Sequence, residues 1–146
     1  MRKVIIPLIL IVMCLSFSGC LHAGKPNSFS SGVPSGWLSV DIREDISYDN
    51  AWEDVFALLS RNFAMDVWGK EEGYIETAWM HSWTGEYQMN YRVKITIKFN
   101  KDRKALQFKP QAHYMIGPNQ WIEGRDSRLV STFKSDLMGI LSRTTR

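Results

Sequence analysis

The side chain whose setting most suggests covalent chemistry is the thiol of Cys20, which follows Ser18 and Gly19. Small side chains directly before a cysteine fit the narrow subsites of a signal peptidase, and the thiol is the group that is diacylated before cleavage. Acylation of a cysteine attaches a chain to a membrane through lipid. The spacing therefore predicts Cys20 as a lipidation site and as the first residue of the mature protein.

Residues 1–19 have the composition of a signal peptide. Two basic residues stand at the start, and residues 4–17 form an apolar stretch of about 14 residues, whereas a membrane-spanning helix needs roughly 20. Together with the cysteine that follows, they resemble the bacterial lipobox, except that Phe17 stands where an aliphatic residue is usual. The alternative is an ordinary secretory signal that is cut elsewhere, with Cys20 unmodified.

Lipidation would account for both cysteines of the chain. Cys14 would leave with the signal and Cys20 would carry palmitate or a similar acyl group, so the folded part would contain no disulfide, thiolate metal site or cysteine nucleophile. The three acyl chains typical of a bacterial lipoprotein form a lasting anchor, which one chain does not. By resemblance to enterobacterial sorting, Leu21 favours the outer membrane over the inner membrane.

Residues 20–36 are predicted to be the lipidated cysteine and a flexible tether. The segment 22–36 is rich in Gly, Ser and Pro and has no apolar periodicity, so about 15 flexible residues would reach roughly 20 Å. Phe29 and Val33 are isolated apolar residues in this segment, and we expect solvent to surround them. Residues 37–146 are predicted to form a single domain of ordinary size.

The charge of the chain gives no indication of a nucleic-acid surface. There are 18 basic and 15 acidic residues, and loss of the two basic residues of the signal leaves 16 against 15. Domains that bind nucleic acid usually carry a clear basic excess on one face. We therefore expect no nucleic acid among the partners.

Hydrophobic periodicity alternates between that of strands and that of helices. Residues 37–42 alternate as a short strand, and the unbroken alternation from 87 to 99 predicts a long strand with one polar face. Two stripes with helical spacing predict amphipathic helices, the first with Trp52, Val55, Phe56, Leu59 and Phe63 and the second with Leu129, Val130, Phe133, Leu137, Ile140 and Leu141. Ser47 is the expected N-cap of the first helix, and Asp126 or Ser127 that of the second.

Three further strands complete the predicted sheet, at residues 65–68, 74–83 and 106–114. Pro110 places the last of these at a sheet edge, because proline cannot donate a hydrogen bond to a neighbouring strand. Residues 115–125 are predicted to be a long loop, since they contain two glycines and a proline. The order β-α-β-β-β-β-α predicts a two-layer α+β fold, in which an antiparallel sheet of about five strands carries two helices on one face.

The predicted order of elements and three short motifs resemble the repeated domain of the BamC (NlpB) family. The motifs are DISYDNAW at 45–52, FAMDV at 63–67 and GYIET at 73–77. BamC proteins are lipoprotein accessories of the outer-membrane β-barrel assembly machinery, and a curved sheet grips a helix in their helix-grip domains. The resemblance implies a helix-grip-like domain over residues 37–143 and a role linked to outer-membrane protein assembly. BamC has two such domains and a long N-terminal segment, whereas this sequence predicts one domain and a short tether.

No spacing in the sequence points to catalysis. His22, His81 and His113 form no metal-ligand pattern, and the sequence contains no nucleophile elbow, phosphate-binding loop or nucleotide fingerprint. Glu71 and Glu72 fit a solvated turn better than a catalytic pair. We therefore expect no enzymatic activity, no cofactor and no metal ion.

Aromatic side chains are the remaining candidates for function, because the chain has six tryptophans. Trp52 lies on the stripe of the first predicted helix and is expected in the core. Trp121 lies in the predicted loop with Met115 and Ile122, and a large aromatic residue in a loop shaped by Gly and Pro is typical of an interface anchor. The sequence therefore predicts Trp121, Met115 and Ile122 as partner-binding residues.

Two functions fit these observations. The first is a non-catalytic, membrane-anchored accessory module that binds another envelope protein through the predicted loop, the polar sheet face or the edge strand. The second is a binder of a small apolar ligand or lipid between sheet and helix, with a wall made of Tyr87, Tyr91, Trp52 and Phe56. An open cavity beside Trp52 would favour the second function, and a filled core with an exposed Trp or Met patch would favour the first.

Overall fold

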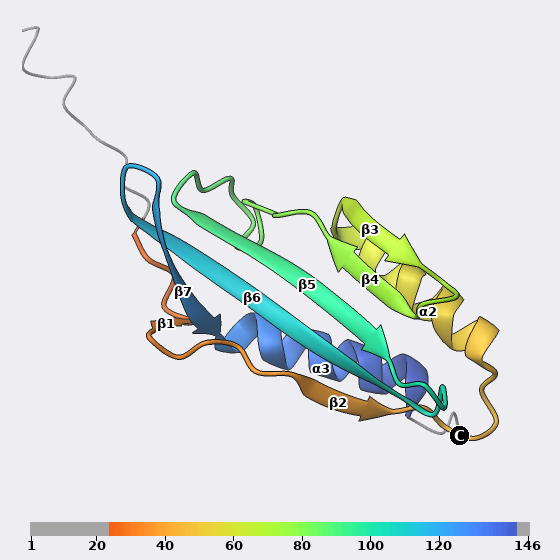
Figure 1. Ribbon diagram of the computed structural model, residues 1–146. Helices are drawn as coiled ribbons and strands as arrows, with labels where there is room; N and C mark the ends of the chain where they lie inside the picture. Colours follow the sequence, from red (N-terminus) through yellow and green to blue (C-terminus); the bar gives the residue numbers. More distant parts are fainter. Residues whose placement is uncertain (1–23, 143–146) are drawn as a thin grey trace, which may run out of the picture.

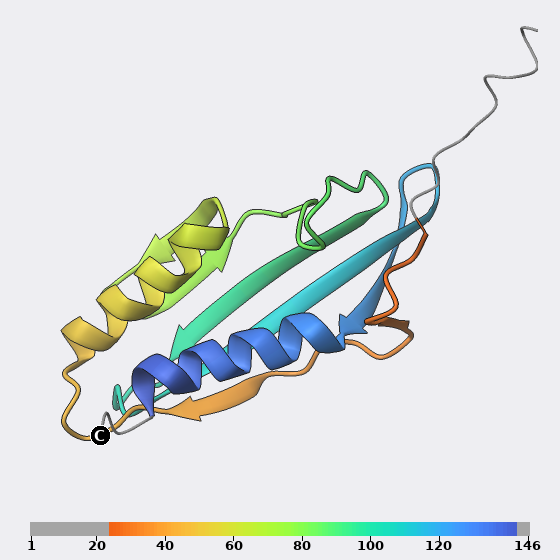
Figure 2. The same ribbon diagram turned by 180° about the vertical axis from the view of Figure 1, so that it is seen from behind.

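The computed structural model describes residues 24–142, so the predicted signal peptide and Cys20 lie outside the described residues. Residues 24–142 form an α+β domain with a seven-stranded antiparallel sheet and two helices. Both helices pack on the same face of the sheet, and no helix of the described residues covers the opposite face (Figure 1 and Figure 2). We call the covered face the inner face and the open one the outer face.

The strands are β1 (Phe29–Ser31), β2 (Leu38–Asp41), β3 (Met65–Gly69), β4 (Tyr74–Thr77), β5 (Tyr91–Phe99), β6 (Ala105–Gly117) and β7 (Gln120–Asp126). They lie in the order β1-β7-β6-β5-β4-β3, and β2 pairs with the first part of β6. Because β5 occupies one side of β6, β2 and β7 share its other side. The helices are α2 (Tyr48–Asn62) and α3 (Ser127–Leu141).

The predicted loop at residues 115–125 is a β-hairpin, so that prediction is wrong. β6 continues to Gly117, a turn at residues 118–119 follows, and β7 begins at Gln120. Asn119 adopts a φ of 59°, the left-handed conformation that lets two antiparallel strands join through a tight turn. Gly117 and Pro118, which suggest a loop, therefore lie at the tight turn between β6 and β7.

Part of the predicted tether also belongs to the sheet. β1 lies within residues 22–36 and pairs with β7, from Phe29 opposite Asp126 to Ser31 opposite Gly124. Phe29 is 2% exposed, so the expectation that solvent surrounds it is wrong, whereas Val33 is exposed as expected. β1 and β7 raise the number of strands from the expected five or so to seven.

The connection between β4 and β5 is longer than the sequence predicts. β4 ends at Thr77 rather than at residue 83, and β5 begins at Tyr91 rather than at residue 87. The segment between them meets the sheet outside the named strands through a bridge of Met80 to Val93. The apolar alternation of β5 extends back to Tyr87 in the sequence. A strand also needs regular backbone hydrogen bonds to a neighbouring strand, however, and residues 81–90 are not part of such a ladder.

Both predicted helices are confirmed, and so is the cap of each. Ser47 accepts a hydrogen bond from the backbone N–H of Asn50 at 3.2 Å. Asp126, rather than Ser127, caps α3 and accepts from the N–H groups of Arg128 and Leu129 at 2.9 and 3.0 Å. No helix within residues 24–142 is long and apolar enough to cross a membrane.

The core lies between the inner face and the two helices. Alternate residues of β5 are fully or almost fully buried there, namely Tyr91, Val93, Ile95, Ile97 and Phe99. The predicted stripes of the helices face them, and Trp52 is 6% exposed, as expected for a core residue. The sheet and both helices thus close one apolar layer, and the polar side of β5 is left on the outer face.

Pro110 lies in β6 at the interval between β2 and β7. The last β2 pair is Leu38 with Phe108, and the first β7 pair is Gly124 with Ala112. The backbone N–H of Ile95, which stands opposite Pro110, donates to Thr77 in the direction of β4. In an antiparallel pair, Pro110 then directs its nitrogen away from β5 and into that interval, where no donor is needed. The expected edge is therefore a local break in the pairing of an otherwise central strand.

Candidate functional site

The outer face gathers long polar and aromatic side chains from neighbouring strands. Because side chains alternate along a strand, β5 directs Arg92, Lys94 and Lys98 to this face while its apolar residues point inward. The register places His113 of β6 opposite Arg92, and Glu123 of β7 opposite His113. A row of three polar side chains therefore crosses β5, β6 and β7.

The guanidinium of Arg92 lies between two tryptophan rings. Its Cζ is 4.4 Å from the ring centre of Trp79 and 4.0 Å from that of Trp121. Such cation–π contacts contribute about 0.5–1 kcal/mol when exposed and about 2 kcal/mol when desolvated. We call these three side chains, Trp79, Arg92 and Trp121, the Arg92 sandwich.

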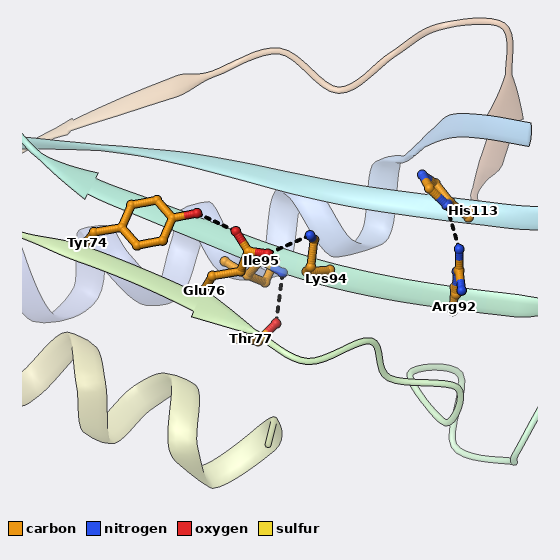
Figure 3. Close-up of polar contacts among 7 residues, drawn as sticks. All are labelled: Tyr74, Glu76, Thr77, Arg92, Lys94, Ile95 and His113. Carbon is orange, nitrogen blue, oxygen red and sulfur yellow. Dashed lines mark hydrogen bonds and ion pairs between the residues drawn. The ribbon is translucent and has the colours of Figure 1, made fainter. Parts of the chain in front are cut away.

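His113 extends the Arg92 sandwich toward β7. Its ring centre is 4.4 Å from that of Trp79, and Arg92 Nη2 lies 3.4 Å from Nδ1 of His113 (Figure 3). Burial and the charge of Arg92 lower the pKa of His113, so the ring is neutral near pH 7 and Nδ1 can accept from the guanidinium. Burial also lowers the pKa of Arg92.

A second polar cluster joins β4 to β5 on the same face. Lys94 Nζ donates to Glu76 Oε1 at 2.7 Å, and the hydroxyl of Tyr74 donates to the other carboxylate oxygen (Figure 3). Burial raises the pKa of Glu76, but the hydrogen bonds from Lys94 and Tyr74 outweigh it and keep the pKa below its usual value. Burial, together with the hydrogen bond to Glu76, raises the pKa of Tyr74 to about 12.

Three further contacts connect lysines of β5 with aromatic rings. Lys94 Nζ lies 5.1 Å from the ring centre of Trp79, which joins the second cluster to the Arg92 sandwich. Lys98 Nζ lies 4.9 Å from the ring centre of Trp37 and 5.8 Å from that of Tyr74. The outer face thus carries alternating cations and aromatic rings from Trp37 to Trp121.

The predicted partner-binding residues divide between the two faces. Met115 and Trp121 stand opposite each other in the hairpin, on the outer face. Trp121 is half-buried rather than free, because it stacks on Arg92. Ile122 points to the inner face and packs against the core, so the structure does not bring it into the same surface.

No local sequence pattern singles out Trp79, Arg92 or Glu123 as site residues. The alternation of β5 does indicate that Arg92 lies on the polar face, which is the one available signal. Of the two tryptophans that enclose it, Trp121 comes from β7 and Trp79 from the connection between β4 and β5, and only the folded structure shows that they meet there.

Packed rings occupy the space where an apolar ligand would lie between the sheet and α2. Trp52 has its ring centre 5.8 Å from that of Phe99 and 6.5 Å from that of Phe56, and Tyr91 lies 5.9 Å from Phe29. Tyr87, the fourth expected wall residue, is 71% exposed. An open hollow of about 460 Å³ lies instead at the hairpin end of the sheet, lined by Asn90, Tyr114, Met115, Ile116, Gly117 and Pro118.

The outer face offers planar rings and fixed charges, groups that can stack on another molecule and form hydrogen bonds with it. Within residues 24–142, no three His, Cys, Asp or Glu side chains lie close enough together to hold a metal ion. No protein-family model matches the chain, and no curated protein matches it either. The function is therefore inferred from the geometry of the chain itself.

Proposed function

We propose that the chain is a non-catalytic lipoprotein of the bacterial cell envelope, anchored at the outer membrane through Cys20, and that it binds another envelope protein. Its sheet and helices have a helix-grip-like arrangement, which uses one face of the sheet for the core and leaves the other available. The observation that carries the proposal is the Arg92 sandwich, which lies on the open face where β5 and β7 begin. The resemblance to BamC favours a partner in outer-membrane protein assembly.

The composition of the outer face is that of an interface centre. Trp, Tyr and Arg are the residue types most enriched at the energetically dominant positions of protein interfaces. In the Arg92 sandwich Trp and Arg side chains already hold one another in place, so they would lose less side-chain entropy on binding a partner than free side chains would. Lys98 and Trp37 are exposed at the other end of β5 on the same face and would form part of the rim.

Two unpaired polar atoms support the same assignment. Arg92 Nε and Glu123 Oε1 are buried, and neither has a hydrogen-bond partner among the described residues. An unpaired buried polar group costs about 1–3 kcal/mol, and native proteins contain few of them. A partner that supplies a donor and an acceptor at the row formed by Arg92, His113 and Glu123 would recover part of that cost.

A lipid anchor suits a binding module. Attachment to a membrane raises the local concentration of the outer face near partners in that membrane, without any new contact. The test is Cys20→Ser, which should abolish palmitate incorporation and leave the protein uncleaved or released from membranes. Normal palmitate incorporation and outer-membrane fractionation of Cys20→Ser would contradict the lipoprotein part of the proposal.

Site-specific photocrosslinking in intact cells tests the binding surface. A photoreactive residue at Gln111, on the outer face of β6, should crosslink to one envelope protein, whereas the same residue at Met138, exposed on α3, should not. Arg92→Ala should weaken the crosslink from Gln111. The matched control is Trp68→Ala, since Trp68 is 55% exposed on β3 and lies outside the Arg92 sandwich. Equal crosslinking from both faces, or an unchanged crosslink in Arg92→Ala, would contradict the proposed surface.

A further inference from the structure

The described chain begins close to the place where a lipid anchor would lie. Gly24 is four residues after Cys20, and because an extended chain spans at most about 3.6 Å per residue, the two lie within about 14 Å of each other. The chain is already fixed a few residues later, since Phe29 pairs in β1 and its N–H donates to the carbonyl of Pro26 at 3.0 Å. The connection from lipid to domain is therefore much shorter than the predicted tether of residues 20–36.

The position of Gly24 defines which end of the domain faces the anchor. The described chain begins at the end of the sheet that carries the turn between β6 and β7, and it ends at the opposite end, beside the turn between β5 and β6 (Figure 1 and Figure 2). We call the first of these the hairpin end. A short connection holds the hairpin end, rather than the opposite end, near the membrane.

Exposed apolar side chains gather at the hairpin end. Ile116 at the end of β6 is 61% exposed, and Tyr87 and Met89 in the connection before β5 are each 71% exposed. The two segments lie side by side, because the N–H of Met115 donates to the carbonyl of Asn90 at 2.8 Å. The open hollow of about 460 Å³ lies at the same place and adds Tyr114 and Pro118 to the apolar surface.

The same surface carries almost no charge. Residues 82–91 and 114–122 contain neither Lys nor Arg, and Glu86 is their one acidic residue. Electrostatic attraction to anionic lipid needs clusters of basic residues, which these segments lack. Apolar and aromatic side chains without charge are instead suited to the boundary between headgroups and acyl chains, where Tyr and Trp are enriched.

We infer that Ile116, Tyr87 and Met89 insert into the lipid surface that holds the anchor and orient the domain on it. The inference rests on the lipid anchor of the proposed function and adds a second contact between protein and membrane. With the hairpin end at the membrane, the strands rise from the surface and the outer face is directed sideways. The Arg92 sandwich is then accessible to a partner in the same membrane.

The experiment uses the full-length, lipidated protein with an environment-sensitive fluorophore on a single introduced cysteine. Acylated Cys20 leaves no other free thiol in the mature chain. In vesicles of phosphatidylethanolamine and phosphatidylglycerol, the label on Ile116→Cys should show a blue-shifted emission and should be quenched by lipids brominated in their tails. Because the segments lack Lys and Arg, high salt should leave both signals unchanged.

Two labelled variants serve as controls for position and for side-chain type. Lys101→Cys places the label in the turn between β5 and β6, at the opposite end of the sheet. Val67→Cys replaces another exposed apolar residue, on β3 and 51% exposed. Both labels should keep the emission of a water-exposed dye and should not be quenched by brominated tails.

The outcomes separate this inference from the proposed function. Mass spectrometry of the same preparations shows whether Cys20 carries lipid, and an unmodified Cys20 would overturn both proposals. A lipidated protein whose label at Ile116 is quenched no more than that at Lys101 or Val67 would overturn membrane insertion alone. The lipid anchor would stand in that case.

Discussion

The two faces of the sheet use tryptophan and its neighbours in different ways. Against the inner face, Trp52 of α2 is 6% exposed and packs on the rings of Phe99 and Phe56. On the outer face, Trp79 and Trp121 enclose the guanidinium of Arg92. The same residue type thus excludes water from apolar neighbours on one face and holds a cation in place on the other.

This difference separates stability from recognition. Burial of a large apolar side chain contributes about 1.5–3 kcal/mol, and truncation of an aromatic one in a core costs about 3–5 kcal/mol. Loss of a half-exposed cation–π contact costs about 0.5–1 kcal/mol. Substitutions on the inner face should therefore act mainly on folding, and those on the outer face mainly on binding.

The largest effect is expected for Trp52→Ala on the inner face. Removal of this buried ring should lower the free energy of unfolding by about 3–5 kcal/mol, as measured by urea denaturation. The matched control, Trp68→Ala, removes a tryptophan that is 55% exposed and should cost no more than about 1 kcal/mol. A loss below about 1 kcal/mol for Trp52→Ala would show that tryptophan contributes no more to stability on the inner face than on the outer face.

A somewhat smaller loss is expected for Asp126→Ala, where β7 meets α3. Asp126 is 1% exposed, caps α3 and accepts a hydrogen bond from the hydroxyl of Tyr91. Loss of the cap costs about 0.5–2 kcal/mol and an unpaired buried hydroxyl about 1–3 kcal/mol, so we expect about 2–4 kcal/mol in urea denaturation. Tyr91→Phe keeps the cap and should cost less, and an equal cost for the two variants would show that the cap contributes nothing.

Trp121→Ala tests the outer face directly. The ring is half-buried on Arg92, so its loss should lower the free energy of unfolding by about 1 kcal/mol. The same variant should lose most of the photocrosslink from Gln111. Thermal melting and crosslinking of one preparation measure both effects. A loss of stability near that of Trp52→Ala would show that the outer face is part of the core.

The smallest effect is expected in the pH dependence that His113 contributes. Burial and the charges of Arg92 and Lys94 lower its pKa against the opposing effect of Glu123, so the unfolded chain binds a proton at a higher pH than the folded one. The stability due to this group is then complete above the usual pKa of 6.5 and falls as the pH drops through that value. His113→Gln should weaken the loss of unfolding free energy between about pH 7.5 and about pH 5.5. An unchanged loss would place the titrating group elsewhere.

Local patterns account for the part of the fold that the sequence predicts. The apolar stripes of α2 and α3, their caps and the alternation of β5 each lie within about 15 consecutive residues, where side-chain spacing reports directly on burial. β1 and β7 lack such a signal. β1 has three residues, and Phe29 finds its partner Asp126 almost a hundred residues later in the chain.

The candidate site was accessible to sequence analysis only in part. The sequence predicts Trp121, Met115 and Ile122 together as large apolar residues of a loop, and the hairpin places the first two opposite each other. Ile122 lies on the inner face instead, because neighbouring residues of a strand point to opposite faces. The meeting of Trp79 with Arg92 depends on the path of the connection between β4 and β5, which no local pattern predicts.

The sequence by itself determines that this chain builds an α+β domain with two one-sided helices, since hydrophobic spacing within each element decides which side must be buried. The tertiary structure alone decides which tryptophans meet a cation and which meet apolar rings, because most of those neighbours belong to other elements of the fold. It also decides that Phe29 is part of the sheet, which shortens the connection to Cys20. Local periodicity shows which side chains must be buried, whereas the residues that each side chain contacts are set by the assembled fold.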